Sequence, residues 1–412
     1  MRLDRITADI PDDVPVATVV LDCTRESETG DQAVLTRWRD LRRDLEVQRA
    51  DEATLEAIGE RIRTISKAGG RHGRVLVGAR GEVLLDCALS EPPAADEAIY
   101  DRGPHVFPLA RVADEHVRYL IASVDRSGAD LTFHESANAL TAGAEAETVE
   151  GGHDDVKKAK NVGGRLQGRI QNRAEDSWER NAEAVAAEID RIVSERRPEL
   201  LIVTGDIRAR TLVVDRLGRA AKETHVVVDG GSRSEGVKPE VFQARVAAAL
   251  EQLRLRRREA VLDKLREAQG QDGPTVTGRV DVLDVLRRGQ VAELVVTEAV
   301  AGPPSSLAGK KLWVGNGPLE IGLSQQDVLD LGATAPHQVR ADLALGRAAL
   351  AQGAGVTVAD EASVRLPDGV GALLRWEDAA TPDDHVFSQS ADPHREGRSR
   401  VGRSQAVQAP RP

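Results

Sequence analysis

The chain has 412 residues, more than one ordinary hydrophobic core holds, so typical domain sizes predict two to four units. Charged residues make up 30% and hydrophobic residues 41%, a balance that excludes a disordered or membrane-embedded class. A formal net charge of -11 and only 2% aromatic residues argue against whole-surface nucleic-acid binding and against a base-stacking platform, so any RNA contact must be local.

The N-terminal sequence MRLDRITADIPDDVP carries acids and a proline where a signal peptide needs a basic start and an apolar stretch. No run approaches eighteen apolar residues, so we expect a cytoplasmic protein that does not contact a membrane. The two cysteines, Cys23 and Cys87, each close an apolar strand-like run, which is typical of small buried hydrophobic side chains. We expect neither a disulfide nor a metal ligand from them.

The first predicted unit, residues 1–116, is a mixed α/β domain. An apolar strand at residues 15–21 precedes two helical patterns, and Gly69 and Gly70 end the second. Two short strands, RVLVGA and EVLLDC, follow around the turn residues Arg80 and Gly81. The apolar stripes of the two helices are Val34, Leu35, Trp38, Leu41 and Leu45, then Leu55, Ile58, Ile62 and Ile65.

The second predicted unit covers residues 117–237. It opens with a hairpin, RYLIASV and LTFHES, around a polar turn that contains Gly128. Residues 151–164, GGHDDVKKAKNVGG, have four glycines and no apolar period, which predicts an exposed, mobile loop. A long helical pattern through Trp178 and Ile189 ends before Pro198, and the strands ELLIVTG and HVVVDG flank a further helix. This alternation favours an α/β sheet with packed helices.

The third predicted unit, residues 238–378, is a small α/β sandwich. It begins with a long amphipathic helix and continues through the strand AELVVTE, a helix that carries Val339, Leu343 and Leu350, and the strands GVTVAD and GVGALLRW. Residues 379–412 are rich in Pro, Ser, Gln, Asp and Arg, and they have too few apolar residues to form a core. We expect a disordered tail.

This order of units resembles that of the archaeo-eukaryotic peptide release factor superfamily, in particular its bacterial branch of Balon-like and Pelota-like proteins. Three segments carry the resemblance: VGGRLQGRIQNRAEDSWERN, LLIVTGDIRARTLVVDRL, and the closing pair GAGVTVAD and GVGALLRW. Together they span roughly residues 117–376. The resemblance implies a three-domain architecture with an RNase H-like central domain. It also implies a central loop that reaches the peptidyl-transferase centre of the ribosome, and a third domain that contacts the ribosome and an elongation-factor-type GTPase.

The central motif departs from that of true release factors, which place a glutamine directly after two glycines. Here Gly163 and Gly164 are followed by Arg165 and Leu166 before Gln167. Peptide release needs the glutamine backbone N–H near the developing oxyanion, and two extra residues displace it by up to ~7 Å against a tolerance of ~0.5 Å. The sequence therefore argues against efficient hydrolysis of peptidyl-tRNA, and no catalytic residue is expected.

A local basic run lies inside this acidic chain. Between Val156 and Arg173 there is no acidic residue, and three arginines recur at four-residue spacing, which places them on one helical face if a helix starts near Arg165. Phosphate is the natural ligand, and the alternative is a solvated helix face beside an ordinary linker. The RNA-binding residues we expect are Lys157, Lys158, Lys160, Gly163, Gly164, Arg165, Gln167, Arg169 and Arg173.

Other candidate sites have simpler explanations. Gly205 and Asp206 follow a strand, where α/β proteins often bind ligands, yet a helix N-cap by Asp206 is favoured. Asp22, Asp125 and Asp206 lack the spacing that a metal nuclease needs, and the histidines lack zinc-ligand spacing. We therefore expect no metal and no cofactor.

A second basic segment lies in the first helix of the third unit. Arg254, Arg256, Arg257 and Arg258 could bind ribosomal RNA or a GTPase, although the charged outer face of a long helix is the favoured interpretation.

Three functions remain open from the sequence. The favoured one is a monomeric, non-enzymatic factor of hibernating or stalled ribosomes that occupies the A site and contacts 23S rRNA near the peptidyl-transferase centre. The second is a peptidyl-tRNA hydrolase that uses Gln167 with Gly163 and Gly164. The third is a stress-associated scaffold that never meets the ribosome, which the basic run disfavours.

Overall fold

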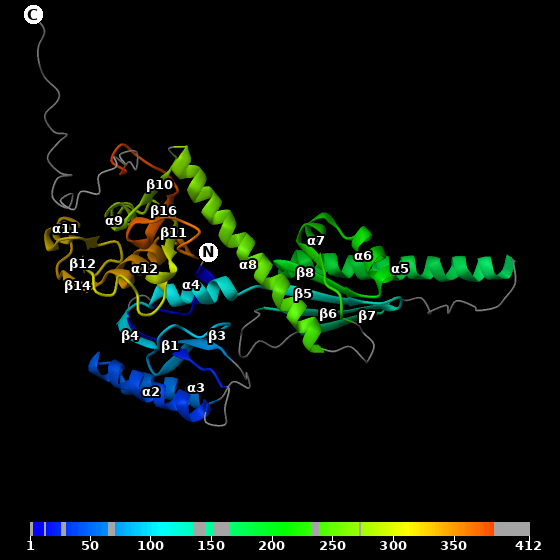
Figure 1. Ribbon diagram of the computed structural model, residues 1–412, viewed down its shortest axis with the longest axis horizontal. Coiled ribbons are helices and arrows are strands. Elements are labelled where there is room, and N and C mark those ends of the chain that lie inside the picture. Colours follow the sequence, from blue (N-terminus) through cyan, green and yellow to red (C-terminus); the bar gives the residue numbers. More distant parts are fainter. Residues whose placement is uncertain are drawn as a thin grey trace, which may run out of the picture.

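The computed structural model describes residues 3–11, 14–25, 30–64, 71–135, 145–150, 165–231, 239–271 and 273–382. Within these ranges the side chains at 145–146, 150 and 165–176, among a few others, are outside the description. The predicted loop at 151–164 and residues 383–412 of the predicted tail 379–412 therefore lie outside the described residues. The chain forms four β-sheets with helices packed on them, so the predicted mixed α/β class is confirmed (Figure 1).

The N-terminal unit is a four-stranded antiparallel sheet in the order β3-β2-β1-β4. Its apolar stripes behave as predicted, since Val34, Trp38, Leu41 and Leu45 are buried against one face together with the second stripe. Ile65 lies outside the described residues. The elements are α1 (Asp4–Thr7), β1 (Pro15–Asp22), α2 (Gly30–Val47), α3 (Glu52–Arg63), β2 (Gly73–Ala79), β3 (Glu82–Leu89), β4 (Glu97–Arg102) and α4 (Val106–Glu115).

The central unit is a five-stranded sheet in the order β7-β6-β5-β8-β9, in which β5, β8 and β9 are parallel and β6 and β7 are antiparallel additions. Its helices α5, α6 and α7 bury one face, and the first half of α8 buries the other. The elements are β5 (Tyr119–Val124), β6 (Gly128–His134), β7 (Glu145–Glu150), α5 (Arg165–Arg196), β8 (Leu200–Gly205), α6 (Ile207–Arg216), α7 (Arg219–Thr224) and β9 (His225–Val227). Helix α8 (Pro239–Gly270) follows, and its second half packs on the C-terminal unit.

The C-terminal unit has a mixed sheet in the order β10-β16-β11-β15 and a small second sheet, β13-β12-β14. The second sheet was not predicted, and it corrects one assignment, because Val339 lies in β14 and the helix begins only at Ala341. The elements are β10 (Thr275–Thr277), α9 (Arg279–Arg287), β11 (Val291–Thr297), α10 (Glu298–Ala301), β12 (Lys311–Val314), β13 (Ile321–Gly322), α11 (Gln325–Asp330), β14 (His337–Arg340), α12 (Ala341–Ala351), β15 (Gly355–Ala359), η1 (Pro367–Gly369) and β16 (Val370–Leu374).

The N-terminal and C-terminal units share one hydrophobic core. Helix α4 supplies Phe107 and Leu109 to a cluster that contains Val75 of β2 together with Leu294 of β11 and Leu345 of α12. We call these two units together the body and the central unit the arm. Figure 1 shows the two units of the body side by side, with α8 running obliquely from the body to the arm. No helix among the described residues has the length and apolar character to cross a membrane.

Candidate nucleic-acid interface

Helix α5 carries the part of the predicted RNA-binding set that the structure describes. It begins at Arg165, directly after Gly164, and no acidic residue lies in its first turn. The helix start agrees with the condition under which Arg165, Arg169 and Arg173 share one helical face. It also places Gln167 within the first turn. The side chains of these four residues, and the whole of residues 151–164 with Lys157, Lys158, Lys160, Gly163 and Gly164, lie outside the described residues.

The arm holds α5 by its second half. The side chains of α5 are described from Ser177 onward, and among them Val185 and Ile189 pack on Leu120 and Leu131 of the sheet. A helix of 32 residues is about 48 Å long, so its first turns extend well past these contacts. Figure 1 shows this end of α5 projecting from the sheet, on the side away from the body. The predicted loop is therefore attached to the tip of a projecting helix.

The turn between β5 and β6 contacts α5 at Trp178 and Asn181. The Arg126 guanidinium lies 4.7 Å from the centroid of the Trp178 ring, a cation–π contact. The buried Asn181 side chain donates through Nδ2 to the Arg126 carbonyl oxygen at 3.0 Å. Because backbone and side chain of one residue are both held, the direction of α5 relative to the sheet is fixed at this point.

The C-terminal end of α5 is fixed as well. Arg118, which precedes β5, donates to the carbonyl oxygens of Arg196 and Arg197 at 3.1 and 3.0 Å. These carbonyls lack helical partners at the end of a helix, so a cation there satisfies them and also interacts favourably with the helix dipole. The Asp190 carboxylate accepts from the Gly218 N–H at 2.8 Å and ties α5 to the start of α7. The half of α5 from Trp178 to Arg196 is thus fixed to the arm near both of its ends.

The turn after β8 is structural. Asp206 caps α6, accepting from the N–H groups of Arg208 and Ala209 at 3.0 Å each. Gly205 has φ +113°, and a Cβ there would lie 1.9 Å from the Val124 carbonyl oxygen. The favoured interpretation of this turn as an N-cap is confirmed.

The acidic set of a metal nuclease is not assembled. Asp125 accepts from the N–H groups of Ser127 and Gly128 in a tight turn, whereas Asp22 lies in the sheet of the N-terminal unit and accepts from Thr24. Over the described ranges, no group of three or more His, Cys, Asp or Glu side chains could hold a metal ion. The cysteines are free, and burial raises the pKa of Cys23 and of Cys87 to about 11, so neither is a thiolate at neutral pH.

The interpretation of the α8 arginines as an outer helix face is wrong for three of the four. Arg254 is only 7% exposed, and its guanidinium donates to the Glu115 carbonyl oxygen. Arg257 pairs with Glu199 and Arg258 with Asp114. Only Arg256 is exposed and has no ion pair within the described part of the chain. These arginines face other elements of the protein, and the helix periodicity alone could not reveal that.

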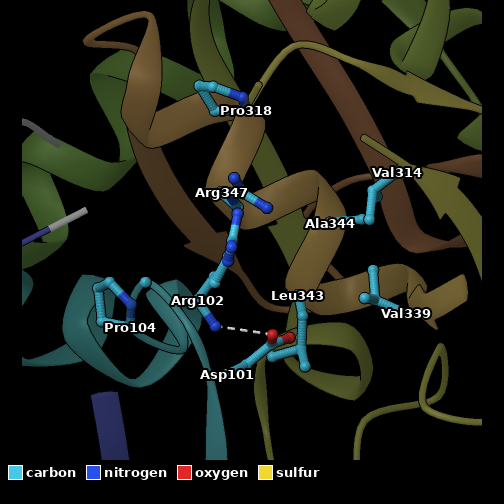
Figure 2. Close-up of a pocket in the computed structure, with 10 residues that line it drawn as sticks. Asp101, Arg102, Pro104, Val314, Pro318, Val339, Leu343, Ala344 and Arg347 are labelled. Carbon is cyan, nitrogen blue, oxygen red and sulfur yellow. Dashed lines mark hydrogen bonds between the residues drawn. The ribbon is translucent and has the colours of Figure 1, made fainter. Parts of the chain in front are cut away.

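A pocket lies between the two units of the body. Figure 2 shows Arg102 and Arg347 in it, with Val339 and Leu343 on the opposite side. Arg102 donates to the Asn316 side-chain oxygen at 3.3 Å, and Arg347 donates to the Asn316 carbonyl oxygen at 2.7 Å. Both guanidinium groups thus hold the segment after β12, one from β4 and one from α12, and the pocket is part of the interface between the units.

The segment that contains the candidate interface matches a family of known proteins. Residues 118–271 match the model of bacterial archaeo-eukaryotic release factor family 2. This segment runs from the residue before β5 through α8, and so contains the whole arm, the predicted loop and α5. The match bears out the resemblance inferred from the sequence.

Similar proteins match over most of the chain. The uncharacterized protein Rv2629 of Mycobacterium tuberculosis (strain ATCC 25618 / H37Rv) is 27% identical over 377 residues, which cover 91% of this chain and 97% of that protein. Among solved structures, Dom34 of S. cerevisiae is 10% identical, with a TM-score of 0.38 over 76% of this chain and 81% of Dom34. Archaeoglobus fulgidus Pelota is 12% identical, with a TM-score of 0.34 over 91% and 92%. At these values the two structures carry no functional argument.

Proposed function

We propose that this relative of the bacterial archaeo-eukaryotic release factors is a ribosome-binding translation factor of hibernating or stalled ribosomes. The tip of α5 and the segment 151–164 would occupy the A site near the peptidyl-transferase centre and contact 23S rRNA. The observation that carries the proposal is the family match over residues 118–271, because it covers the element that bears the basic run. The proposal includes a cytoplasmic, monomeric factor that acts without a cofactor.

Local charge supports this use of the tip. Residues 157–173 contain six basic and no acidic side chains in a chain of net charge -11. The described half of α5 is different, since Arg191 there is paired with Glu188 and Glu195. Toward the projecting end of α5, by contrast, no acidic residue lies between the basic residues in the sequence. A flexible polyanion such as rRNA is attracted by such a concentration of charge through release of its counterions.

The position of Gln167 supports occupancy without hydrolysis. Gln167 lies in the first turn of α5, two residues beyond the position that directly follows the glycine pair. A catalytic amide must stand within about 0.5 Å of its working position, and this offset is several ångströms. The alternative is a peptidyl-tRNA hydrolase that uses Gln167 with Gly163 and Gly164. We further propose, from the family resemblance alone, that the C-terminal unit docks an elongation-factor-type GTPase.

The first test is cosedimentation with vacant 70S ribosomes over a salt series. Replacing Lys157, Lys158 and Lys160 with Glu should weaken binding and reduce the slope of log affinity against log salt by about 2 to 3, since each lost phosphate contact removes nearly one unit. A matched control applies the same charge change to exposed residues on three other elements, Lys264→Glu, Lys311→Glu and Arg43→Glu. Equal binding by both variants would contradict the proposed contact.

Hydrolysis is tested separately, with peptidyl-tRNA release measured on the same ribosomes. We expect Gln167→Ala to bind with little loss of affinity, because the basic residues of the run remain, and we expect neither this variant nor the wild-type protein to release peptide. Release by the wild type that Gln167→Ala abolishes would replace the proposal with the hydrolase alternative.

A further inference from the structure

The arm and the body are joined by two stretches of chain. Residues 116–118 connect α4 of the body with β5 of the arm, and α8 crosses back. The first half of α8 packs on the arm through Val246 and Leu250, and its second half packs on the body through Leu262 and Leu265. Between these two apolar contacts lies the arginine cluster, which we define as Arg254, Arg257 and Arg258.

Each arginine of the cluster reaches a different group near the crossing. Arg258 Nη2 lies 2.8 Å from Asp114 Oδ2, and Arg254 Nη2 donates to the Glu115 carbonyl oxygen at 3.2 Å, so both hold the end of α4 in the body. Arg257 forms a hydrogen-bonded ion pair with Glu199. Glu199 directly precedes β8 of the arm, and its N–H donates to the Arg118 carbonyl oxygen at 2.8 Å.

The burial of these groups makes the contacts specific. Arg254 is buried, and the side chains of Arg258 and Asp114 are 27% and 16% exposed. Removal of one partner from such a pair leaves a charge that neither water nor a counter-ion fully compensates. The middle of α8 can therefore bend or turn relative to α4 only by leaving several half-buried charges without partners.

We propose that the arginine cluster fixes the direction in which the arm, and with it the tip of α5, points from the body. Arg254, Arg257 and Arg258 are positioning residues: within the described part of the chain, their contacts with other elements are to the end of α4 and to Glu199 before β8. The inference rests on the proposed function only for its effect on ribosome binding. The direction of the arm is a property of the free protein and is measured without ribosomes.

The direct test is single-molecule energy transfer between a dye on α2 of the body and a dye on α5 of the arm. Exposed alanines serve as attachment points in Ala33→Cys and Ala184→Cys. The native thiols react slowly at neutral pH because burial raises the pKa of Cys23 and Cys87 to about 11. Wild type should give one narrow distance distribution, and Arg258→Glu should shift or broaden it.

Two controls separate positioning from general damage. Arg256→Glu makes the same charge change on the adjacent, exposed residue, and it should leave the distribution narrow. Arg258→Glu combined with Asp114→Arg reverses the ion pair, and it should restore the wild-type distribution and thermal unfolding curve. Arg257→Glu combined with Glu199→Arg reverses the ion pair between α8 and the arm in the same way, and it should also restore the wild-type distribution. A narrow, unshifted distribution in both Arg258→Glu and Arg257→Glu would overturn the proposal.

Ribosome cosedimentation adds an independent readout. If about a tenth of Arg258→Glu molecules hold the correct direction, affinity falls about tenfold while the salt slope stays unchanged. The charge reversal should restore affinity. A reduced salt slope that the reversal does not restore would show that Arg258 contacts RNA directly, and would overturn the positioning role. Failure of wild-type protein to bind ribosomes would reject the proposed function, and the energy-transfer result would still decide the role of the cluster.

Discussion

Glu97 and His105 of the N-terminal unit meet Arg340 and Asp342 of the C-terminal unit in a buried ionic cluster. Arg340 Nη1 donates to Glu97 Oε1 at 2.8 Å, and its Nη2 lies 2.5 Å from Asp342 Oδ2. The His105 ring stands between the two carboxylates, with Nδ1 3.5 Å from Glu97 and Nε2 3.7 Å from Asp342. Four residues from two units therefore depend on one another for charge compensation.

This cluster predicts a loss of stability in acid. Burial alone would raise the pKa of Glu97, but hydrogen bonds and charge from His105 and Arg340 outweigh it and lower the pKa to about 2. A carboxyl whose pKa is lowered by folding stabilises the protein above its unfolded value near 4.5, and this contribution disappears as the pH falls toward 2. A shift of this size corresponds to about 3 kcal/mol. Urea unfolding between pH 2 and 7 measures it.

The comparison variant is Glu97→Gln, which removes the titrating group and keeps the shape of the side chain. It should be less stable than wild type at pH 7, and the difference should shrink as the pH approaches 2. Glu91→Gln, on the exposed surface, should follow the wild-type curve throughout. A constant difference between Glu97→Gln and wild type over the whole range would show that the pKa of Glu97 is the same in the folded and the unfolded protein, and so is not lowered by folding.

Single residues could be assigned from the sequence where the cause is local. The N-cap at Asp206 follows from the residue type and the next three positions, and the inert cysteines follow from the apolar runs they close. The role of Arg258 could not be assigned, because its partner Asp114 is 144 positions away. Helix periodicity predicts which residues share a face of the helix, but it does not predict which other elements contact that face.

At the scale of elements, α12 and α4 approach each other closely at Gly346. A Cβ at Gly346 would lie 2.9 Å from the Val106 Cβ, which no real pair of side chains tolerates without movement. Gly346→Ala should therefore destabilise the protein by about 1–2 kcal/mol, because a clash of about 1–3 kcal/mol exceeds the helix propensity gain of up to about 1 kcal/mol. Thermal and urea unfolding measure the change.

Gly270→Ala is the matched control for this substitution. Gly270 also lies in a helix, at the end of α8, and no atom of the described residues lies within 4 Å of its Cβ position. Its replacement should leave the free energy of unfolding unchanged or raise it by a few tenths of a kcal/mol. If Gly346→Ala were equally neutral, α4 and α12 would not pack as closely as the structure shows.

The strongly patterned elements were predictable and the short ones were not. Apolar strands bounded by turn residues, such as β8 and β11, appear where the sequence places them. The strand β14 has four residues and runs into α12 without a turn, so its Val339 was assigned to the helix. Four residues are too few to distinguish the two-residue period of apolar side chains in a strand from the 3.6-residue period in a helix. The segment is a strand because it pairs with β12.

For the candidate site, the start of α5 and the order of its basic residues could be predicted from the sequence. The contacts that fix α5 on the arm are known only from the structure. Nothing in the local pattern of Trp178 or Asn181 indicates that they meet the turn at Arg126, since that contact joins segments more than fifty positions apart. The projection of α5 beyond the sheet depends on how much of the helix contacts the sheet. The periodicity of the sequence predicts the length of the helix but not the extent of this contact.

At the scale of the whole molecule, the body has one hydrophobic core that combines residues of the N-terminal and C-terminal units, so we expect it to unfold cooperatively. The shared core places Leu345 of α12 among buried side chains of both units, where it is 0% exposed. Leu345→Ala should cost about 2–5 kcal/mol, the usual range for a truncated core leucine. Because the core is continuous, this loss should increase amide hydrogen exchange in β2 of the N-terminal unit as much as in β11 of the C-terminal unit.

The arm offers the matched comparison for this experiment. Ile189 of α5 is equally buried, but its cluster contains only residues of the arm. Ile189→Ala should therefore increase exchange in β5 and β8 and leave β2 and β11 protected. If Leu345→Ala increased exchange in β11 while β2 kept its protection, the two units of the body would unfold separately. In that case α4 would be a surface contact between two folded domains, and the ionic cluster at Glu97 would carry most of their association.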